Sequence, residues 1–190
     1  LNTEGYEAVR SLLDEIRVLK IDSDYLESLY TLTIREPAFS EVNFSPIDMD
    51  IQITLPCWCL IPRHSFGVIM TNLIRNAIDA MEASTVHPRL LTIAVRRRGD
   101  GIAVTVSDTG PGCTDEPIER IFEPFFTTKG RGANMGMGLT ICRSIVEDMG
   151  GRIHAEHNPD GGLSVTFTVP QETADVTEFE AADVAEVTTR

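Results

Sequence analysis

Two asparagines four residues apart are the first residues in this sequence whose type and spacing suggest chemistry. Asn72 and Asn76 lie in the stretch MTNLIRNAIDAM, residues 70–81, where apolar residues recur at helical spacing. Residues four apart emerge on one face of a helix, and Asp79 lies close to that face. Asparagine is a mediocre helix former, because its amide competes with the backbone for hydrogen bonds. The pair is therefore either a solvent-exposed edge or a polar site on an otherwise apolar helix.

A carboxylate followed by glycines is the second candidate. Asp108 ends the strand-like alternation of AVTVSDTGPGC, and Gly110 and Gly112 come directly after it. Glycines at this place let a flat ligand lie against the backbone, and a buried carboxylate needs good hydrogen-bond donors. The exocyclic amine of adenine would supply one such donor. The alternative is an Asx-type turn that simply closes the strand.

A glycine-rich segment before a helix is the third candidate. GRGANMGMGLTICRS places Gly132, Gly136 and Gly138 directly before a helical pattern. A helix N-terminus offers free backbone N–H groups and a favourable dipole to a phosphate. No Gly-Lys-Ser/Thr follows, so this is not a Walker loop, and the spacing is not a Rossmann fingerprint. On its own the segment is equally a flexible connection.

Composition limits the possible functions. The net charge of −13 argues against sequence-independent binding to nucleic acid or to an anionic membrane surface. No run of about 18 apolar residues predicts a transmembrane helix, and the start lacks the pattern of a signal peptide. The four cysteines complete no zinc pattern and favour a reduced, cytoplasmic protein.

The hydrophobic periodicity predicts the elements that must position these residues. Helices are expected over residues 5–20, 24–35, 63–83 and 139–149, and strands over 48–55, 57–62, 89–98, 101–108, 152–158 and 163–170. The turns GDG and PDGG indicate hairpins, and no regular βαβ rhythm is present. The predicted fold class is α/β (α+β), a two-layer sandwich with one mixed, mostly antiparallel sheet and helices on a single face.

The order of these motifs resembles a known superfamily. NLIRNAIDAM is similar to the N box of the GHKL ATPases, DTGPG to their first glycine box, IFEPFFTTK to the F box and MGMGLTICRSIVEDMGG to the second glycine box. These ATPases include gyrase, the heat-shock chaperone, histidine kinases and MutL, and they share the Bergerat fold. The match covers about residues 48–170 and looks most like the catalytic ATP-binding domain of bacterial sensor histidine kinases, in the nitrogen-regulation and oxygen-sensing subfamily.

The resemblance implies roles for the two asparagines. Asn76 would be the ligand of a Mg²⁺ ion that also binds the ATP phosphates, because an amide oxygen suits this hard cation. Asn72 occupies the position where gyrase and the chaperone have a glutamate that activates water. An asparagine cannot act as a general base, which suits an enzyme that passes its phosphoryl group to a histidine instead of hydrolysing ATP.

The resemblance also implies the rest of the site. Asp108 would receive the adenine amine, with Gly110 and Gly112 as the adenine-side wall. Lys129 would contact the γ-phosphate and stabilise it during transfer. The remaining nucleotide-binding residues would be Asp79 and, through their backbone amides, Gly136, Gly138 and Leu139. The phenylalanines of the F box are expected to pack a lid rather than to touch ligand: Phe122, Phe125 and Phe126.

Two features depart from the family pattern. Asn134 stands where many members have the first of three glycines, and asparagine tolerates left-handed backbone angles better than most residues. None of the four histidines lies on a helix with an acidic neighbour before the N box: His64, His87, His154 and His157. The sequence therefore predicts that the chain lacks its own phosphoacceptor.

The predicted organisation has three parts. Residues 1–40 form an N-terminal helical segment, which is either a dimerisation-domain remnant or linker, or a helix that packs on the domain's own sheet. Residues 41–170 form the catalytic domain, and residues 171–190 form an acidic, disordered tail.

The predicted function is transfer of the ATP γ-phosphoryl to a histidine on a separate dimerisation domain. ATP and Mg²⁺ would be the cofactors and a response regulator the downstream partner, with no contact to nucleic acid or membrane. One alternative is a nucleotide-responsive binding module of a degenerate kinase. The other is a gyrase- or MutL-type ATPase, against which Asn72 and the lack of a transducer domain speak.

Overall fold

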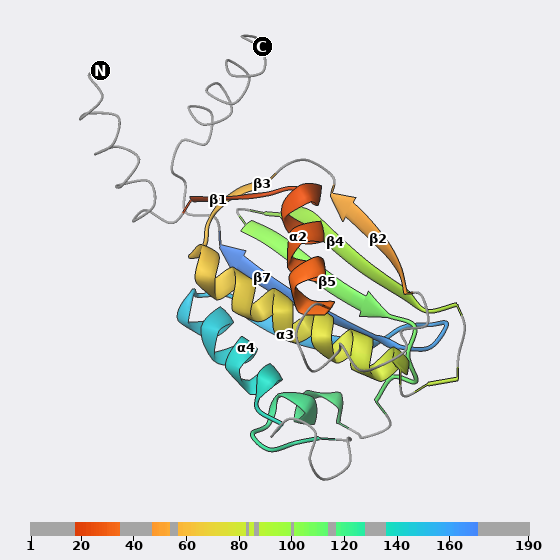
Figure 1. Cartoon of the computed structure of the whole chain (residues 1–190). Coiled ribbons are helices and arrows are strands. Elements are labelled where there is room, and N and C mark those ends of the chain that lie inside the picture. The colour runs from red at the N-terminus through yellow and green to blue at the C-terminus, as the bar shows by residue number, and fades with distance from the viewer. Residues whose placement is uncertain are drawn as a thin grey trace, which may run out of the picture.

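A computed structural model shows a two-layer α/β domain (Figure 1). It describes residues 18–34, 47–53, 57–82, 84–85, 88–99, 101–113, 117–127 and 136–170. The elements in chain order are β1 (Val18–Ile21), α2 (Ser23–Ile34), β2 (Asp48–Ile53), β3 (Cys57–Leu60), α3 (Arg63–Glu82), β4 (Leu90–Arg98), β5 (Gly101–Asp108), the 3₁₀ helix η2 (Ile118–Phe122), α4 (Gly138–Asp148), β6 (Arg152–His157) and β7 (Leu163–Pro170).

The main sheet has five strands in the order β2-β4-β5-β7-β6. β2 runs parallel to β4, and the other neighbouring strands are antiparallel. Helices α2, α3 and α4 cover one face of this sheet (Figure 1). Alternate residues of the three central strands point to that face and are buried: Leu91, Ile93, Val95, Ile102, Val104, Val106, Val165, Phe167 and Val169. The predicted two-layer sandwich with a mixed, mostly antiparallel sheet is confirmed.

Helix α3 forms the centre of the helical layer. Its apolar residues recur every three or four positions and are buried against the sheet: Phe66, Ile69, Met70, Leu73, Ile74, Ala77, Ile78 and Met81. Phe66 is fully buried, with its ring 5.9 Å from that of Tyr25 and 6.0 Å from that of Phe167. This aromatic cluster joins α2, α3 and the sheet into one core.

The N-terminal region differs from the prediction. The expected helix over residues 5–20 is wrong for its last residues, because Val18–Ile21 form β1 and pair antiparallel with Cys57–Leu60. A short stretch containing Val and Ile satisfies its backbone by pairing with another strand, and tertiary context overrides a helical periodicity. Residues 5–17 lie outside the described residues.

Residues 18–34 also pack into the main core, although the sequence assigned them to a separate N-terminal segment. Leu19 and Ile21 of β1 and Leu26 and Leu29 of α2 are buried in the same apolar cluster as α3. Whether residues 5–17 belong to a dimerisation domain, to a linker or to this domain stays a prediction, because they lie outside the described residues.

The other predicted elements agree with the structure to within a few residues, as is usual at element ends. The 3₁₀ helix η2 was not predicted, and the acidic tail lies outside the described residues. Among the described helices, none has the length and apolar character needed to cross a membrane.

We expect Phe66→Ala to lower the free energy of unfolding by about 3–5 kcal/mol, because it empties a fully buried site that three elements share. Urea denaturation measures this change. The control is Leu32→Ala, whose side chain on α2 is 63% exposed and whose loss should change stability by no more than about 0.5 kcal/mol. Equal effects of the two variants would contradict the assigned core.

Candidate functional site

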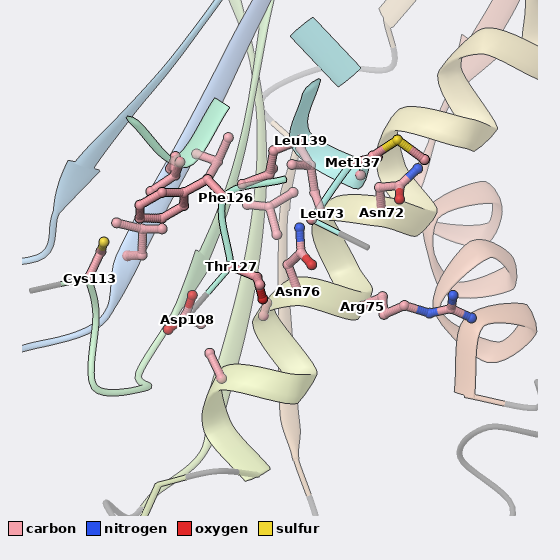
Figure 2. A pocket seen from close by; sticks show the side chains of 18 of the residues that line it. Asn72, Leu73, Arg75, Asn76, Asp108, Cys113, Phe126, Thr127, Met137 and Leu139 are labelled. Atoms are coloured by element: carbon pink, nitrogen blue, oxygen red, sulfur yellow. The ribbon is translucent and has the colours of Figure 1, made fainter. Parts of the chain in front are cut away.

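A cavity of about 330 Å³ lies between α3, the end of β5 and the start of α4 (Figure 2). Seven of the predicted site residues line it: Asn72, Asn76, Asp108, Gly112, Gly136, Gly138 and Leu139. Asp79 and Gly110 are not among the lining residues, and Lys129 lies outside the described residues. The structure therefore brings together, in one cavity, residues that are up to 67 positions apart in the chain (Asn72 to Leu139).

Asp108 is the buried acidic group of the cavity, with only 7% of its surface exposed. Its Oδ1 accepts a hydrogen bond of 2.8 Å from the Gly110 N–H. Burial raises the pKa of the Asp108 carboxyl, while hydrogen bonds from the backbone N–H groups of Gly110 and Leu163 lower it in part. The carboxylate is thus held rigidly in an environment where a further donor, supplied by a ligand, would be favourable.

Gly110 stands where two parts of the backbone approach closely. A Cβ at this position would lie 2.8 Å from the Asp108 Oδ1 and 3.2 Å from backbone and side-chain atoms of Ala80 in α3. Gly110 does not line the cavity. Its lack of a side chain lets the end of β5 pack closely on α3. Gly112, with a φ of +73°, borders the cavity itself.

Asn72 lies directly against the start of α4 at the border of the cavity. The Asn72 Nδ2 donates to the Val68 carbonyl one turn earlier, at 2.8 Å. Its Oδ1 points at Gly138, where a Cβ would lie only 2.8 Å away. Met137, the N-cap of α4, supplies no side-chain hydrogen bond to the helix. Within the part of the chain that the structure describes, the first N–H groups of α4 thus receive no cap from the N-cap side chain, and an anion could accept from them.

The aromatic segment before α4, Ile118–Phe126, is joined by hydrogen bonds to Gly136 and to α4 itself. The Phe125 N–H donates to the Gly136 carbonyl at 3.1 Å, and the Thr140 hydroxyl donates to the Phe122 carbonyl at 3.1 Å. Gly136 has a φ of +63°, and a Cβ there would meet the Phe126 carbonyl oxygen at 2.5 Å. Only glycine fits this crossing.

The three phenylalanines do not share one role. Phe122 is buried in the core, and Phe125 is 71% exposed. Phe126 lines the cavity, a position that the sequence did not predict, and the expectation that it packs the lid rather than touching a ligand stays a prediction. The Arg120 guanidinium lies over the Phe126 ring, 5.4 Å from its centre, in a cation–π contact.

Sequence reasoning missed several residues of the cavity. They are mostly apolar or small: Leu73, Ala77, Ala80, Val106, Cys113, Ile121, Thr127, Met137, Ile141, Leu163 and Val165, together with Arg75. Apolar periodicity marks Leu73 and Val106 as buried, but it cannot distinguish a core wall from a cavity wall. Figure 2 shows the Arg75 guanidinium pointing away from Asn76 and Asp108, so its charge is not directed at the cavity.

The arrangement suits a purine nucleotide. One end of the cavity has a buried carboxylate between apolar side chains, and the other has the start of α4, which the Met137 side chain does not cap, together with two asparagine amides. A base can insert between apolar walls and donate to the carboxylate, while phosphates can accept from the backbone N–H groups. Fold and site together define an ATPase domain of the Bergerat type.

Comparison with known proteins agrees with this class. Residues 63–173 match the family described as histidine kinase-, DNA gyrase B- and HSP90-like ATPases. The match covers more than half of the chain, which therefore belongs to this family.

Curated relatives are sensor kinases. The chain is 46% identical over 111 residues to the sensor protein FixL of Bradyrhizobium diazoefficiens, which is 58% of this chain and 21% of FixL. It is 31% identical over 147 residues to the signal transduction histidine-protein kinase BaeS of Escherichia coli, which is 74% of this chain and 30% of BaeS. The chain thus spans less than a third of the length of either relative.

Solved structures lead to the same domain type. The catalytic domain of the histidine kinase ThkA superposes with a TM-score of 0.63 at 28% identity, over 81% of this chain and 95% of that one. The mycobacterial sensor histidine kinase MprB has the same fold, with a TM-score of 0.66 at 17% identity, over 82% of this chain and 98% of that one. The domain is an ATP-binding catalytic domain of the histidine-kinase type.

Asp108→Asn should separate stability from binding. A carboxyl whose pKa is raised in the folded state binds its proton more tightly there than in the unfolded chain. Its ionisation therefore costs stability above the folded-state pKa, and this cost is relieved as the pH falls toward the ordinary value of 3.8. We expect the variant to melt at the same or a higher temperature than wild type at pH 7, with the difference shrinking toward pH 4.

The same variant should bind ATP at least about tenfold more weakly, because one position of the amide would present N–H₂ to the adenine amine. Calorimetric titration measures the affinity. A lower melting temperature at pH 7 together with unchanged ATP affinity would contradict the role of the carboxylate.

Cysteine alkylation provides a second test of the cavity. Cys113 lines the cavity, whereas Cys142 is fully buried and burial raises the pKa of its thiol to about 12. In the native protein we expect ATP to slow alkylation of Cys113 several-fold, and Cys142 to react only after unfolding. Peptide mass spectrometry distinguishes the sites. Equal labelling of Cys113 with and without ATP would show that nucleotide does not occupy this cavity.

Proposed function

We propose that this domain binds Mg-ATP in the cavity and transfers the γ-phosphoryl group to a histidine on a dimerisation domain, as part of a two-component sensor kinase. The observation that carries the proposal is the position of Asp108. It is a buried carboxylate at one end of a cavity whose other end has the N-terminus of α4. A nucleotide has a donor at its base and negative charge at its phosphates, so it matches both ends.

At the base end, Asp108 would accept a hydrogen bond from the exocyclic amine. The carboxylate is held by the Gly110 N–H, and Val106, Ile121 and Leu163 contribute apolar surface to the same cavity. These side chains would exclude water from the amine, which strengthens its hydrogen bond to the carboxylate. Phe126 would add a further apolar wall.

At the phosphate end, the N–H groups of Gly138 and Leu139, at the start of α4 and on the cavity wall, would donate to phosphate oxygens. Gly138 leaves room for the Asn72 amide, because a Cβ would lie 2.8 Å from its Oδ1 and would displace it. Lys129 would add a positive charge at the γ-phosphate and stabilise the charge that develops there during transfer.

The residues present suit a Mg²⁺ ion next to the phosphates. Asn76 lies on α3 and borders the cavity through its amide (Figure 2). Its oxygen would hold the ion, which keeps several waters and neutralises phosphate charge when bound. Asp79 is one turn further along the helix but does not line the cavity. Its role would be indirect.

Asn72 would favour transfer over hydrolysis. Its amide has no basic group, and its Nδ2 is already engaged with the Val68 carbonyl. A water molecule beside it would therefore meet no general base. This supports a kinase over a gyrase- or MutL-type ATPase, in agreement with the sensor kinases among the relatives.

The acceptor histidine would come from another domain. His64 on α3 and His154 and His157 on β6 are exposed, and none of them lines the cavity. A cytoplasmic location and a response regulator as the next partner follow from the proposed two-component function. The signal-sensing part would lie in the remainder of a longer protein.

Calorimetric titration of ATP with and without Mg²⁺ tests the proposal. We expect wild type to bind Mg-ATP in the micromolar to millimolar range, and Asn76→Ala to lose most of the gain in affinity that Mg²⁺ provides. Asp108→Ala should lose affinity with or without the ion. The control is His64→Ala, an exposed position on the same helix.

A phosphotransfer assay then distinguishes a kinase from a binding module. The chain is mixed with labelled ATP and a dimerisation domain of a related sensor kinase, and acid-labile, base-stable label on that domain is measured. Label that depends on Asn76 supports the proposal. No binding of ATP by wild type would overturn it.

A further inference from the structure

The turn between β6 and β7, Asn158–Gly162, packs directly on the end of β5. The Asn158 N–H donates to the Gly162 carbonyl at 3.2 Å, and the Gly161 N–H donates to the Asn158 carbonyl at 3.1 Å. Gly162 has a φ of +93°, and a Cβ there would overlap the carbonyl oxygen of Asp108. The turn therefore touches the main chain of the residue that is expected to recognise the base.

The Asn158 side chain bridges this contact. Its Nδ2 donates to the Asp108 carbonyl at 2.9 Å, and its Oδ1 accepts from the Ser164 hydroxyl. The Ser107 and Ser164 hydroxyl oxygens are 2.6 Å apart. Because a hydroxyl has one proton and that of Ser164 goes to Asn158, Ser107 donates to Ser164. The chain of hydrogen bonds thus runs from β5 through β7 to the turn and back to Asp108.

This bridge occurs where the regular sheet ends. The β5–β7 ladder stops at the pair Ser107 and Ser164, so Asp108 lies one residue beyond it. The Asp108 carbonyl accepts its hydrogen bond from the Asn158 side-chain amide instead of from a further pair of the ladder. The carboxylate of Asp108 accepts hydrogen bonds from the N–H of Gly110, just after β5, and from the N–H of Leu163, the first residue of β7.

We propose that Asn158 is a positioning residue for nucleotide binding, which fixes the Asp108 main chain so that its carboxylate meets the exocyclic amine of the base. The proposal rests on the proposed function, since it concerns the same site. Asn158 itself does not line the cavity and acts through Asp108. Its contribution should therefore depend on whether the ligand carries the amine.

The test compares ATP with purine riboside triphosphate, which lacks the exocyclic amine. In Asn158→Ala we expect ATP affinity to fall about five- to tenfold, because the carboxylate is no longer held at the amine. Affinity for the analogue should fall less than twofold. Asn158→Asp has nearly the same size, but it cannot donate to the Asp108 carbonyl and adds a negative charge beside it. It should lose at least as much ATP affinity as Asn158→Ala.

The matched control is Thr166→Val. The Thr105 and Thr166 hydroxyl oxygens are 2.9 Å apart on the same two strands, two residue pairs further from Asp108 along the ladder than Ser107 and Ser164. We expect the control to lower the melting temperature about as much as Asn158→Ala, with the ratio of the two affinities unchanged. If Asn158 only stabilised the fold, the ratio of the affinity for ATP to the affinity for the analogue would not change in Asn158→Ala.

An NMR measurement keeps the proposal testable without nucleotide. The amide proton of Gly110 reports its hydrogen bond to Asp108, so its chemical shift should move in Asn158→Ala and Asn158→Asp but not in Thr166→Val. An unmoved Gly110 signal, or equal losses of affinity for ATP and the analogue, would overturn the role of Asn158. If wild type bound neither nucleotide, the proposed function itself would fail, which is a distinguishable result.

Discussion

The packing of α3 on the sheet is the constraint on which the rest of the site depends. Its buried stripe, from Phe66 to Met81, can face only the apolar side of the strands. This orientation directs the partly buried edge with Asn72 and Asn76 toward the end of β5 and the start of α4. The burial that stabilises the fold therefore also positions the two amides. A rotation of α3 would both expose its apolar stripe and turn Asn72 and Asn76 away from the cavity.

Close backbone crossings then complete the cavity. Gly110 lets the end of β5 approach α3, Gly136 lets the start of the α4 region approach the aromatic segment, and Gly138 makes room for the Asn72 amide. Gly162 brings the β6–β7 turn onto Asp108 in the same way. These glycines are needed by the protein's own packing before any ligand is considered. A side chain at Gly110, Gly136 or Gly162 would meet backbone atoms of a neighbouring segment, and one at Gly138 would displace the Asn72 amide.

Asp108 represents a balance between stability and function. Burial raises the pKa of its carboxyl, so an ionised Asp108 is unfavourable for the fold taken alone. Backbone N–H groups and the Asn158 bridge to its carbonyl hold the residue in one place. A buried, rigidly held carboxylate gains most from a ligand that donates a hydrogen bond to it. The free-energy cost of burying the ionised Asp108 would therefore be offset when a base with an exocyclic amine binds.

The sequence by itself determined the class of the domain and most of its elements, because periods of two and about 3.6 residues report which faces are buried, and because four short motifs carry the site's polar groups in a fixed order. Only the tertiary structure decided that residues 18–21 form a strand, since its stabilisation comes from pairing with residues 57–60 and from burial of Leu19 and Ile21. It also decided that Gly110 packs against α3 next to the cavity and that Phe126 lines the cavity. The hydrogen bond from Asn158 to Asp108, 50 residues apart in the chain, likewise depends on the tertiary structure. Local periodicity reports whether a residue is buried, but not against what, and contacts between distant segments arise only once the sheet order is set.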